Sequence, residues 1–213
     1  KKINIKNKKV VSVSTQNNEI ETDYLIASAD YAHVENQLLE KKYRNYSTEY
    51  WNKKNFSPSS LLFYLGVSKK LNKLDHHTLF FDEDIEQHSN DIYEKPIWPK
   101  KPLFYACCPA KTDPKVAPKD KENLFILVPI AAGLNDTEEI REEYFKIVMK
   151  RLEKFCGEKI TEHVEYKKSY CVNDFITDYN AFKGNAYGLA NTLMQTANLK
   201  PKIVNKQLQN MYY

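Results

Sequence analysis

Apolar segments of strand length alternate along the chain with polar segments rich in proline, asparagine and charge. Some carry apolar side chains at every second position, as a half-buried strand does, and others are continuously apolar, as a strand buried on both faces is. The predicted strands lie within residues 3–14, 20–27, 61–67, 77–81, 103–108, 123–129, 160–170 and 208–213. Because several follow one another through short connections, we expect hairpins.

A long helix is predicted after residue 135. Residues 135–139 resemble a capping box, and Gly157 suits the residue that follows a helix ending at Cys156. Its apolar stripe has a period close to 3.6 residues. The stripe consists of Ile140, Tyr144, Ile147, Val148, Leu152 and Phe155.

Shorter helices are predicted from their start signals. Asp30 is a good N-cap for a helix over 31–39, and the acidic residues 82–84 precede a helix over 85–93. A helix or turn begins at Asp174, and a helix over 189–199 is also expected. The mixture predicts an α+β fold, with a mostly antiparallel central sheet flanked by helices.

The connection over 109–118 is unusual for a hairpin. Pro109, Pro114 and Pro118 restrict their own backbone and that of the preceding residues. We therefore expect a stiff connection between the strands at 103–108 and 123–129, where a plain hairpin would use a short turn with Gly or Asn.

Composition excludes some classes of protein. The 213 residues are 42% hydrophobic and 28% charged, as in globular proteins, and the net charge of +4 is too small to indicate nucleic-acid binding. No signal peptide is visible, and the longest apolar run, 124–134, is too short to span a membrane. A mildly basic face on an anionic membrane and an ordinary solvated surface both stay open.

The cysteines and histidines show no metal-binding spacing. There is no C-x-x-C and no H-E-x-x-H, so no metal site is predicted. Cys107 and Cys108 are adjacent and should face opposite sides of a strand. We interpret them, with Cys156 and Cys171, as reduced thiols that fill a core in a cytoplasmic protein.

Only five glycines occur, and none forms a G-x-G-x-x-G, a P-loop or a G-x-S-x-G motif. The chain alone is therefore not expected to bind a nucleotide. Gly184 and Gly188 mark the one place where the backbone could approach a flat ligand closely. Aromatic residues are dense over 40–58, where they could line a groove or pack in a core.

Six segments lie in the order found in one known family. They are Asp23-Tyr-Leu-Ile-Ala-Ser-Ala-Asp30, Ser60-Leu-Leu-Phe-Tyr-Leu-Gly-Val67, His76-His-Thr-Leu-Phe-Phe-Asp-Glu-Asp84, Tyr105-Ala-Cys-Cys-Pro-Ala-Lys-Thr-Asp-Pro-Lys-Val-Ala-Pro118, Glu122-Asn-Leu-Phe-Ile-Leu-Val-Pro129 and Lys183-Gly-Asn-Ala-Tyr-Gly188. With these, the chain resembles the bacterial-type phytoene desaturases, carotenoid desaturases of the FAD-dependent amine oxidase-like superfamily. The segment 105–118 is the most specific.

The resemblance implies a domain organisation. Family members open with a G-x-G-x-x-G fingerprint and close with a glycine-rich flavin segment, and neither is present here. The chain therefore resembles an internal-to-C-terminal segment of a longer enzyme. Residues 1–30 are expected to be partial FAD-domain strands, 31–183 the substrate-binding domain, and 184–213 a partial return to the FAD domain.

The resemblance also implies a chemistry, in which a full-length enzyme removes hydrogen from C–C bonds of a long apolar carotenoid and passes hydride to FAD. Quinone or oxygen would reoxidise the flavin, and the enzyme would be cytoplasmic and sit peripherally on a membrane surface. The segment alone is expected to be inactive and free of FAD. No catalytic residue is named, because the cofactor carries the hard chemistry.

Candidate contacts follow from the same resemblance and from residue type. Predicted cofactor contacts are Gly184, Tyr187, Gly188, Ser28, Ala29 and Asp30. Predicted substrate contacts are Phe63, Phe80, Phe81, Tyr105, Phe125 and Tyr187. Strand alternation means that only about half of the residues in each strand face one side, and which half faces the substrate is left open.

Three alternatives stay open beside the desaturase. They are a polyene isomerase or saturase of the same fold, a non-catalytic module that binds an apolar ligand, and a structural domain whose aromatic residues are only core. The carotenoid and the number of desaturation steps are likewise open.

Overall fold

The computed structural model describes residues 2–213, and their contacts divide the chain into two compact units. The first unit takes in the chain up to residue 57 together with 176–182 and 187–213, and the second takes in 58–175 and 183–186. The domains predicted at 1–30, 31–183 and 184–213 were defined by the ligand that each would bind, FAD or the substrate. Contacts within the chain do not identify a bound ligand. That division stays a prediction.

The first unit begins with three antiparallel strands, β1 (Lys2–Lys6), β2 (Lys9–Ser14) and β3 (Glu19–Glu21). The turn at Asn7 and Lys8 has positive φ at both residues, as a two-residue turn between twisted strands requires. β4 (Leu25–Ile26) pairs in parallel with β10 (Met211–Tyr212). The unit's core consists of Ile3, Val10, Val34, Leu39, Leu208 and Met211.

The predicted helix at 31–39 is present in altered form. Asp30 caps α1 (Tyr31–His33) by accepting a hydrogen bond from the His33 N–H, and the helix continues as a π-helix over Val34–Leu38. The buried carboxylate of Glu35 lies in the π-helix and accepts hydrogen bonds from two backbone N–H groups, at Asn45 and Tyr46.

The aromatic residues around 40–58 pack against one another. α2 (Thr48–Asn52) carries the buried Trp51, whose ring lies 5.0 Å from the ring of Tyr31. The ring of Tyr31 also stacks on Tyr213 at 3.8 Å, and Tyr46 stacks on Tyr50 at 4.2 Å. Of the two alternatives left open for this segment, packing is the one that this unit favours.

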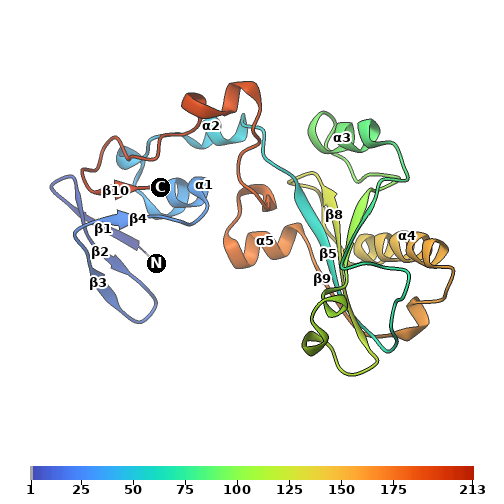
Figure 1. Cartoon of the computed structure of the whole chain (residues 1–213). Helices are drawn as coiled ribbons and strands as arrows, with labels where there is room; N and C mark the ends of the chain where they lie inside the picture. The colour runs from blue at the N-terminus through green and yellow to red at the C-terminus, as the bar shows by residue number, and fades with distance from the viewer. Residues whose placement is uncertain (1) are drawn as a thin grey trace. The chain divides into compact units, whose positions relative to one another are not determined.

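The second unit is built on a five-stranded antiparallel sheet with strand order β6-β7-β8-β5-β9. Figure 1 labels β5, β8 and β9 of this sheet. The strands are β5 (Ser59–Val67), β6 (His77–Phe80), β7 (Phe104–Cys107), β8 (Glu122–Ile130) and β9 (Val164–Tyr170). β5 and β8 pair along all nine of their residues, from Ser59–Ile130 to Val67–Glu122. The α+β prediction with an antiparallel central sheet is confirmed.

Two of the predicted helix starts of this unit are confirmed, whereas the start predicted at Asp174 falls two residues inside a helix that begins at Val172. Asp84 caps α3 (Ile85–Tyr93), and Thr137 caps α4 (Glu138–Cys156) by accepting a hydrogen bond from the Ile140 N–H. α4 ends at Gly157, which has a φ of 67° in the left-handed region that glycine tolerates.

The predicted apolar stripe of α4 was wrong in part. Phe155 is 56% exposed, whereas Arg141, Phe145 and Met149 are buried. A hydrophobicity pattern does not predict the burial of the charged Arg141, because that burial depends on ion pairs with acidic neighbours. α4 buries this stripe against β5 and β8, where each large apolar side chain contributes roughly 1.5–3 kcal/mol.

The proline-rich connection between β7 and β8 is an ordered structure. Two short 3-10 turns, Pro109–Lys111 and Pro114–Val116, form it, each with proline at its start. Asp113 accepts a hydrogen bond from the Lys115 N–H and so caps the second turn.

The remaining elements lie towards the C-terminus. α5 (Val172–Tyr179) follows β9 directly. The helix predicted over 189–199 is wrong, since the segment forms only two 3-10 turns, Leu193–Gln195 and Ala197–Leu199. Among residues 2–213 no helix has the length and apolar character needed to cross a membrane.

Candidate functional site

The two faces of the five-stranded sheet differ in what covers them. In β8 the even-numbered residues from Leu124 to Ile130 are buried, and they pack in one core with α4. The odd-numbered residues of β8, including Phe125 and Leu127, point to the opposite face and are only partly buried. We call that opposite side the open face of the sheet, and the strand pairing places the odd residues of β6 and β7 on it.

Apolar and aromatic side chains dominate the open face. Leu79, in the edge strand β6, is 63% exposed, and Phe81, just after it, is 59% exposed. The ring of Phe125 lies 5.3 Å from Tyr64 and 6.3 Å from Tyr105, so three strands contribute to one aromatic row. Exposed apolar and aromatic side chains that gather on one face are a usual mark of a binding surface.

A cavity of about 260 Å³ opens at one end of the open face, where α3 meets β6 and β7. Its lining is largely apolar. The lining residues are Pro58, Leu79, Phe81, Ile85, His88, Ser89, Ile92, Tyr93, Leu103, Phe104, Tyr105 and Pro129. Such a cavity fits part of an apolar chain and offers few groups to a polar ligand.

His88 fixes α3 over this cavity. The Leu103 N–H donates to Nδ1 of the ring at 2.9 Å, so Nδ1 is an acceptor, and Nε2–H then donates to the Pro129 carbonyl, also at 2.9 Å. The buried ring is therefore neutral with its proton on Nε2. One imidazole thus connects α3 to both the start of β7 and the end of β8.

A second cavity, in the first unit, has a different character. It measures about 940 Å³, and its wall includes the charged residues Lys9, Glu21 and Asp23. An apolar hydrocarbon would leave these groups poorly hydrated, so this cavity does not suit such a ligand.

The predicted substrate residues divide between the two faces. Phe81, Tyr105 and Phe125 lie on the open face, where the structure brings them close together. Phe63 is buried against Phe145 of α4, with ring centres 5.4 Å apart.

Phe80 stacks in the same core on Phe104, with ring centres 4.1 Å apart. Tyr187 belongs to the first unit and is 67% exposed. The core positions of Phe63 and Phe80 are explained by packing alone.

The predicted flavin segment is tightly held at its first glycine. Gly184 has a φ of 62°, and its carbonyl accepts a hydrogen bond from the Ser59 hydroxyl at 2.5 Å. A Cβ at this position would lie 2.5 Å from Cγ1 of Val172, so only glycine fits. Gly188 also has a positive φ, 77°, but nothing lies within 4 Å of the position its Cβ would take.

Asp30, which follows β4, connects two segments of the backbone by hydrogen bonds. Both carboxylate oxygens of Asp30 accept backbone hydrogen bonds, one from His33 at 3.0 Å and one from Phe182 at 3.1 Å. Ser28 and Ala29 lie between β4 and this cap. Contacts of these three residues with a cofactor stay a prediction.

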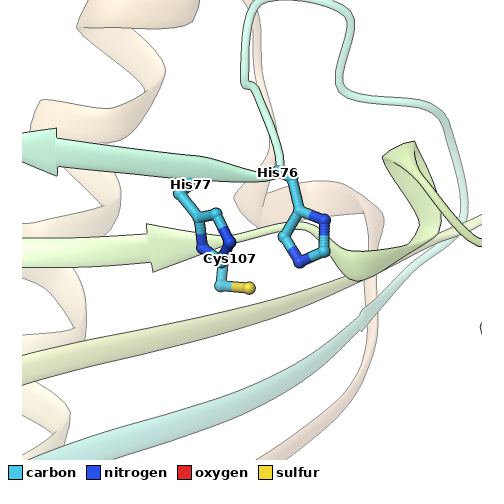
Figure 2. A group of neighbouring side chains, drawn as sticks. All are labelled: His76, His77 and Cys107. Carbon is cyan, nitrogen blue, oxygen red and sulfur yellow. The ribbon is translucent and has the colours of Figure 1, made fainter.

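The structure brings together three side chains that the sequence pattern did not connect. His76, His77 and Cys107 place potential metal-ligating atoms within 4.8 Å of one another (Figure 2). The signal was not visible in the sequence, because His77 and Cys107 become neighbours only through the pairing of β6 with β7.

The other three cysteines are unreactive packing residues. All four cysteines are free and buried. Burial raises the pKa of the Cys108 and Cys171 thiols to about 12 and that of Cys156 to about 11, so these three stay protonated near neutral pH.

Comparison with known proteins identifies relatives over nearly the whole chain. A carotenoid 3,4-desaturase of Haloarcula japonica is 42% identical over 191 residues, which cover 90% of this chain. A phytoene desaturase of Phycomyces blakesleeanus is 29% identical over 92% of the chain. A 4,4'-diapophytoene desaturase of Staphylococcus haemolyticus is 28% identical over 90%. No family model matches the chain.

The chain spans only about two fifths of the length of these relatives, at 39%, 35% and 40% respectively. Among solved structures, an oxidoreductase from Methanosarcina mazei superposes with a TM-score of 0.55 over 99% of this chain and 42% of that one. Its sequence identity is 13%, so the likeness concerns the fold.

Proposed function

We propose that this chain, which is a segment of the carotenoid desaturase family, forms the substrate-binding part of an enzyme that dehydrogenates C–C bonds of a long polyene. The observation that carries the proposal is the open face of the sheet, with its row of aromatic side chains and the apolar cavity beside it. The relatives support the class of reaction, and the open face supports the position of the substrate.

The physical argument concerns what a hydrocarbon can offer a protein. A carotenoid hydrocarbon has no group that can form a hydrogen bond, so its binding depends on apolar area and shape. Burial contributes about 25 cal/mol per Å² of apolar surface removed from water. The polyene would lie along Phe125 and Tyr105 towards Leu79 and Phe81, while α4 seals the other face.

FAD in the full-length parent would accept the hydride. The glycines of this chain form no G-x-G-x-x-G, so they do not build the phosphate site of a dinucleotide. Gly188 fits a flat ligand better than Gly184, because nothing lies within 4 Å of the position its Cβ would take, whereas Val172 fills that position at Gly184. We therefore propose Gly188 and Tyr187 as the residues of this segment nearest the flavin, with quinone or oxygen as the final electron acceptor.

The substrate-face proposal is tested with a matched pair of variants in a full-length enzyme that contains this segment. Phe81 and Phe155 are similarly exposed, at 59% and 56%, but Phe81 lies at the open face and Phe155 on α4. Phe81→Ser should raise KM for phytoene in liposomes at least fivefold, and Phe155→Ser should change it less than twofold. Equal effects of the two variants would contradict the proposal.

The same assay separates the classes of reaction. Products with absorption shifted to longer wavelength indicate new conjugated double bonds, and therefore desaturation. Altered geometry with unchanged conjugation would indicate an isomerase, and binding without any product would indicate a non-catalytic module.

We also propose that the parent enzyme sits peripherally on a membrane surface, where its apolar substrate dissolves. In the first unit the segment 193–204 exposes large apolar side chains, with Leu193 84% and Met194 69% exposed, near Lys200 and Lys202. Exposed apolar residues beside lysines suit an anionic interface.

Vesicle flotation tests the membrane proposal. The chain should float with anionic vesicles, and the double variant Leu193→Ser, Met194→Ser should reduce the bound fraction several-fold. The control Ile20→Ser removes an exposed apolar side chain elsewhere in the first unit and should leave binding unchanged. Flotation of the double variant at the level of the unchanged chain would count against this segment as the contact.

A further inference from the structure

The side chains of His76, His77 and Cys107 converge at one end of the β6–β7 pair. Their potential ligand atoms lie within 4.8 Å of one another, and the rings of the two histidines stack with centres 4.1 Å apart (Figure 2). His77 is directly opposite Cys107 in the strand register, and His76 immediately precedes β6. A hydrogen bond from the Cys108 N–H to the His76 carbonyl, 2.9 Å long, holds this end of the pair together.

Each histidine already has a partner on one ring nitrogen. Nδ1 of His76 lies 2.7 Å from the Thr112 hydroxyl, and Nδ1 of His77 lies 2.5 Å from the Tyr105 hydroxyl. Both hydroxyls can accept a hydrogen bond from Nδ1–H, which leaves the lone pair of each Nε2 for an ion. Metal-binding histidines in proteins characteristically have such a partner on the second nitrogen, because it fixes the tautomer and orients the ring.

We propose that His76, His77 and Cys107 bind one Zn²⁺ ion. Two imidazoles and one thiolate suit this borderline-soft ion, and a water molecule would complete its tetrahedron. On binding, the Cys107 thiol loses its proton to solvent and forms the Zn–S bond as a thiolate. Mg²⁺ and Ca²⁺ prefer oxygen ligands and should not compete.

Binding requires a closing movement and a rotation of one imidazole, because the two stacked rings are only 28° from parallel and their in-plane lone pairs do not meet at one point. Tetrahedral Zn²⁺ bonds place N and S ligands roughly 3.3–3.7 Å from one another. The separation of the ligand atoms, which is now up to 4.8 Å, therefore has to decrease by about an ångström. His77 is exposed and can move without disturbing the core, while Cys107 is buried and stays as the fixed ligand.

The ion would have a structural role that is independent of the proposed desaturase function. His76 is joined through Thr112 to the proline-rich connection, and His77 is joined through Tyr105 to the open face. Zn²⁺ would thus hold the connection, β6 and β7 together, and would fix the Tyr105 side chain beside the apolar cavity.

Metal binding is tested on the full 213-residue chain, purified without a histidine tag. Zn²⁺ is titrated in competition with a chromophoric chelator, and one Zn²⁺ per chain is expected. His77→Ala and Cys107→Ser should each weaken binding at least tenfold. His163→Ala removes a partly exposed histidine of the same unit and should change the affinity less than twofold. Equal affinity in His77→Ala and His163→Ala would overturn the site.

Co²⁺ provides a direct readout of the sulfur ligand. The Co²⁺-loaded chain should show a thiolate-to-cobalt charge-transfer band, which Cys107→Ser abolishes and His163→Ala retains. Thr112→Val removes the hydrogen bond of the hydroxyl to His76, together with its long hydrogen bond to the Pro109 carbonyl, and should weaken Zn²⁺ binding 10- to 100-fold, the usual effect of losing such a partner. Circular dichroism checks that each variant is folded, and a Co²⁺ spectrum without the thiolate band in the unchanged chain would also overturn the proposal.

Discussion

Gly184 and Gly188 are alike in backbone conformation and unlike in surroundings. Both have φ in the left-handed region, at 62° and 77°. At Gly184 the position of a Cβ is blocked by the side chain and carbonyl of Val172, whereas at Gly188 nothing lies within 4 Å of that position. At the scale of single residues, one glycine is required by packing and the other only by its φ.

An alanine at each position separates these two causes. Gly184→Ala places a Cβ 2.5 Å from Val172 Cγ1 and should lower the free energy of unfolding by about 3 kcal/mol, from overpacking and the left-handed backbone together. Gly188→Ala should cost about 1 kcal/mol, from the backbone alone. Urea denaturation measures both values. Similar losses in the two variants would show that Val172 moves aside.

Residue type predicted the burial of the cysteines better than that of the phenylalanines. The thiols of Cys107, Cys108, Cys156 and Cys171 were interpreted as core, and all four are buried. Phe81 and Phe155 were not distinguishable by type, and the structure places one at the open face and the other on the outside of α4. The difference arises from the position of each ring on its element, which hydrophobicity does not encode.

At the scale of elements, a buried ion pair connects the start of α4 to the start of α5. Arg141 donates to both carboxylate oxygens of Asp136 at 2.6 Å and lies 2.8 Å from Asp174. Asp136 also accepts a hydrogen bond from the Asn173 N–H at 2.9 Å. Burial alone would raise the pKa of Asp136, but the hydrogen bonds from Arg141 and Asn173 lower it below its usual value.

This pair makes stability depend on acid pH. A carboxylate whose pKa is lowered by folding stabilises the protein above its unfolded pKa, about 3.9 for Asp, and loses that contribution as the pH falls through the folded pKa. Asp136→Asn should therefore cost about 3 kcal/mol at neutral pH and much less near pH 2. Urea denaturation across this pH range tests the expectation.

Glu138→Gln is the control for that experiment. Glu138 is a strongly exposed partner of Arg141 at 3.5 Å, and its loss should have little effect at any pH. A pH dependence of stability in Asp136→Asn equal to that of the unchanged chain would exclude Asp136 as the responsible group.

Start signals were the most reliable guide to the elements. Asp84 and the segment 135–139 mark where α3 and α4 begin, because a capping side chain satisfies local backbone N–H groups and needs no distant partner. In the segment 189–199, Thr192 and Thr196 precede the two 3-10 turns but make no side-chain cap hydrogen bond, and there the helix prediction failed. Local chemistry therefore predicted the element boundaries where it was present.

At the scale of the whole molecule, each unit is assembled from pieces that lie far apart in sequence. The parallel pair of β4 and β10 joins residues about 186 positions apart, counted from Leu25 to Met211. The β6–β7 register that brings His77 to Cys107 is likewise a product of folding. The metal-ligand cluster and the identity of the open face could not be predicted for this reason, although strand alternation already implied two distinct faces.

The flavin content of the isolated chain tests whether the phosphate-binding site for FAD lies outside this chain. Because the chain holds no dinucleotide fingerprint, we expect it to purify without bound FAD and to retain less than a tenth of an equivalent after added FAD is removed by gel filtration. The absorbance of flavin near its visible maximum, compared with protein concentration, is the measurement. Stoichiometric FAD in the chain would contradict the assignment of the phosphate site to other parts of the parent enzyme.

The nine-residue pairing between β5 and β8 limits where residues can be inserted or deleted without loss of the fold. Neighbouring residues of β8 face alternately the core with α4 and the open face. A one-residue insertion or deletion within either strand would exchange the two faces beyond that point, so core and binding surface would be lost together. The turns between Pro109 and Lys121 have no such alternation, so an insertion or deletion there would leave the core and the open face on their own sides of the sheet.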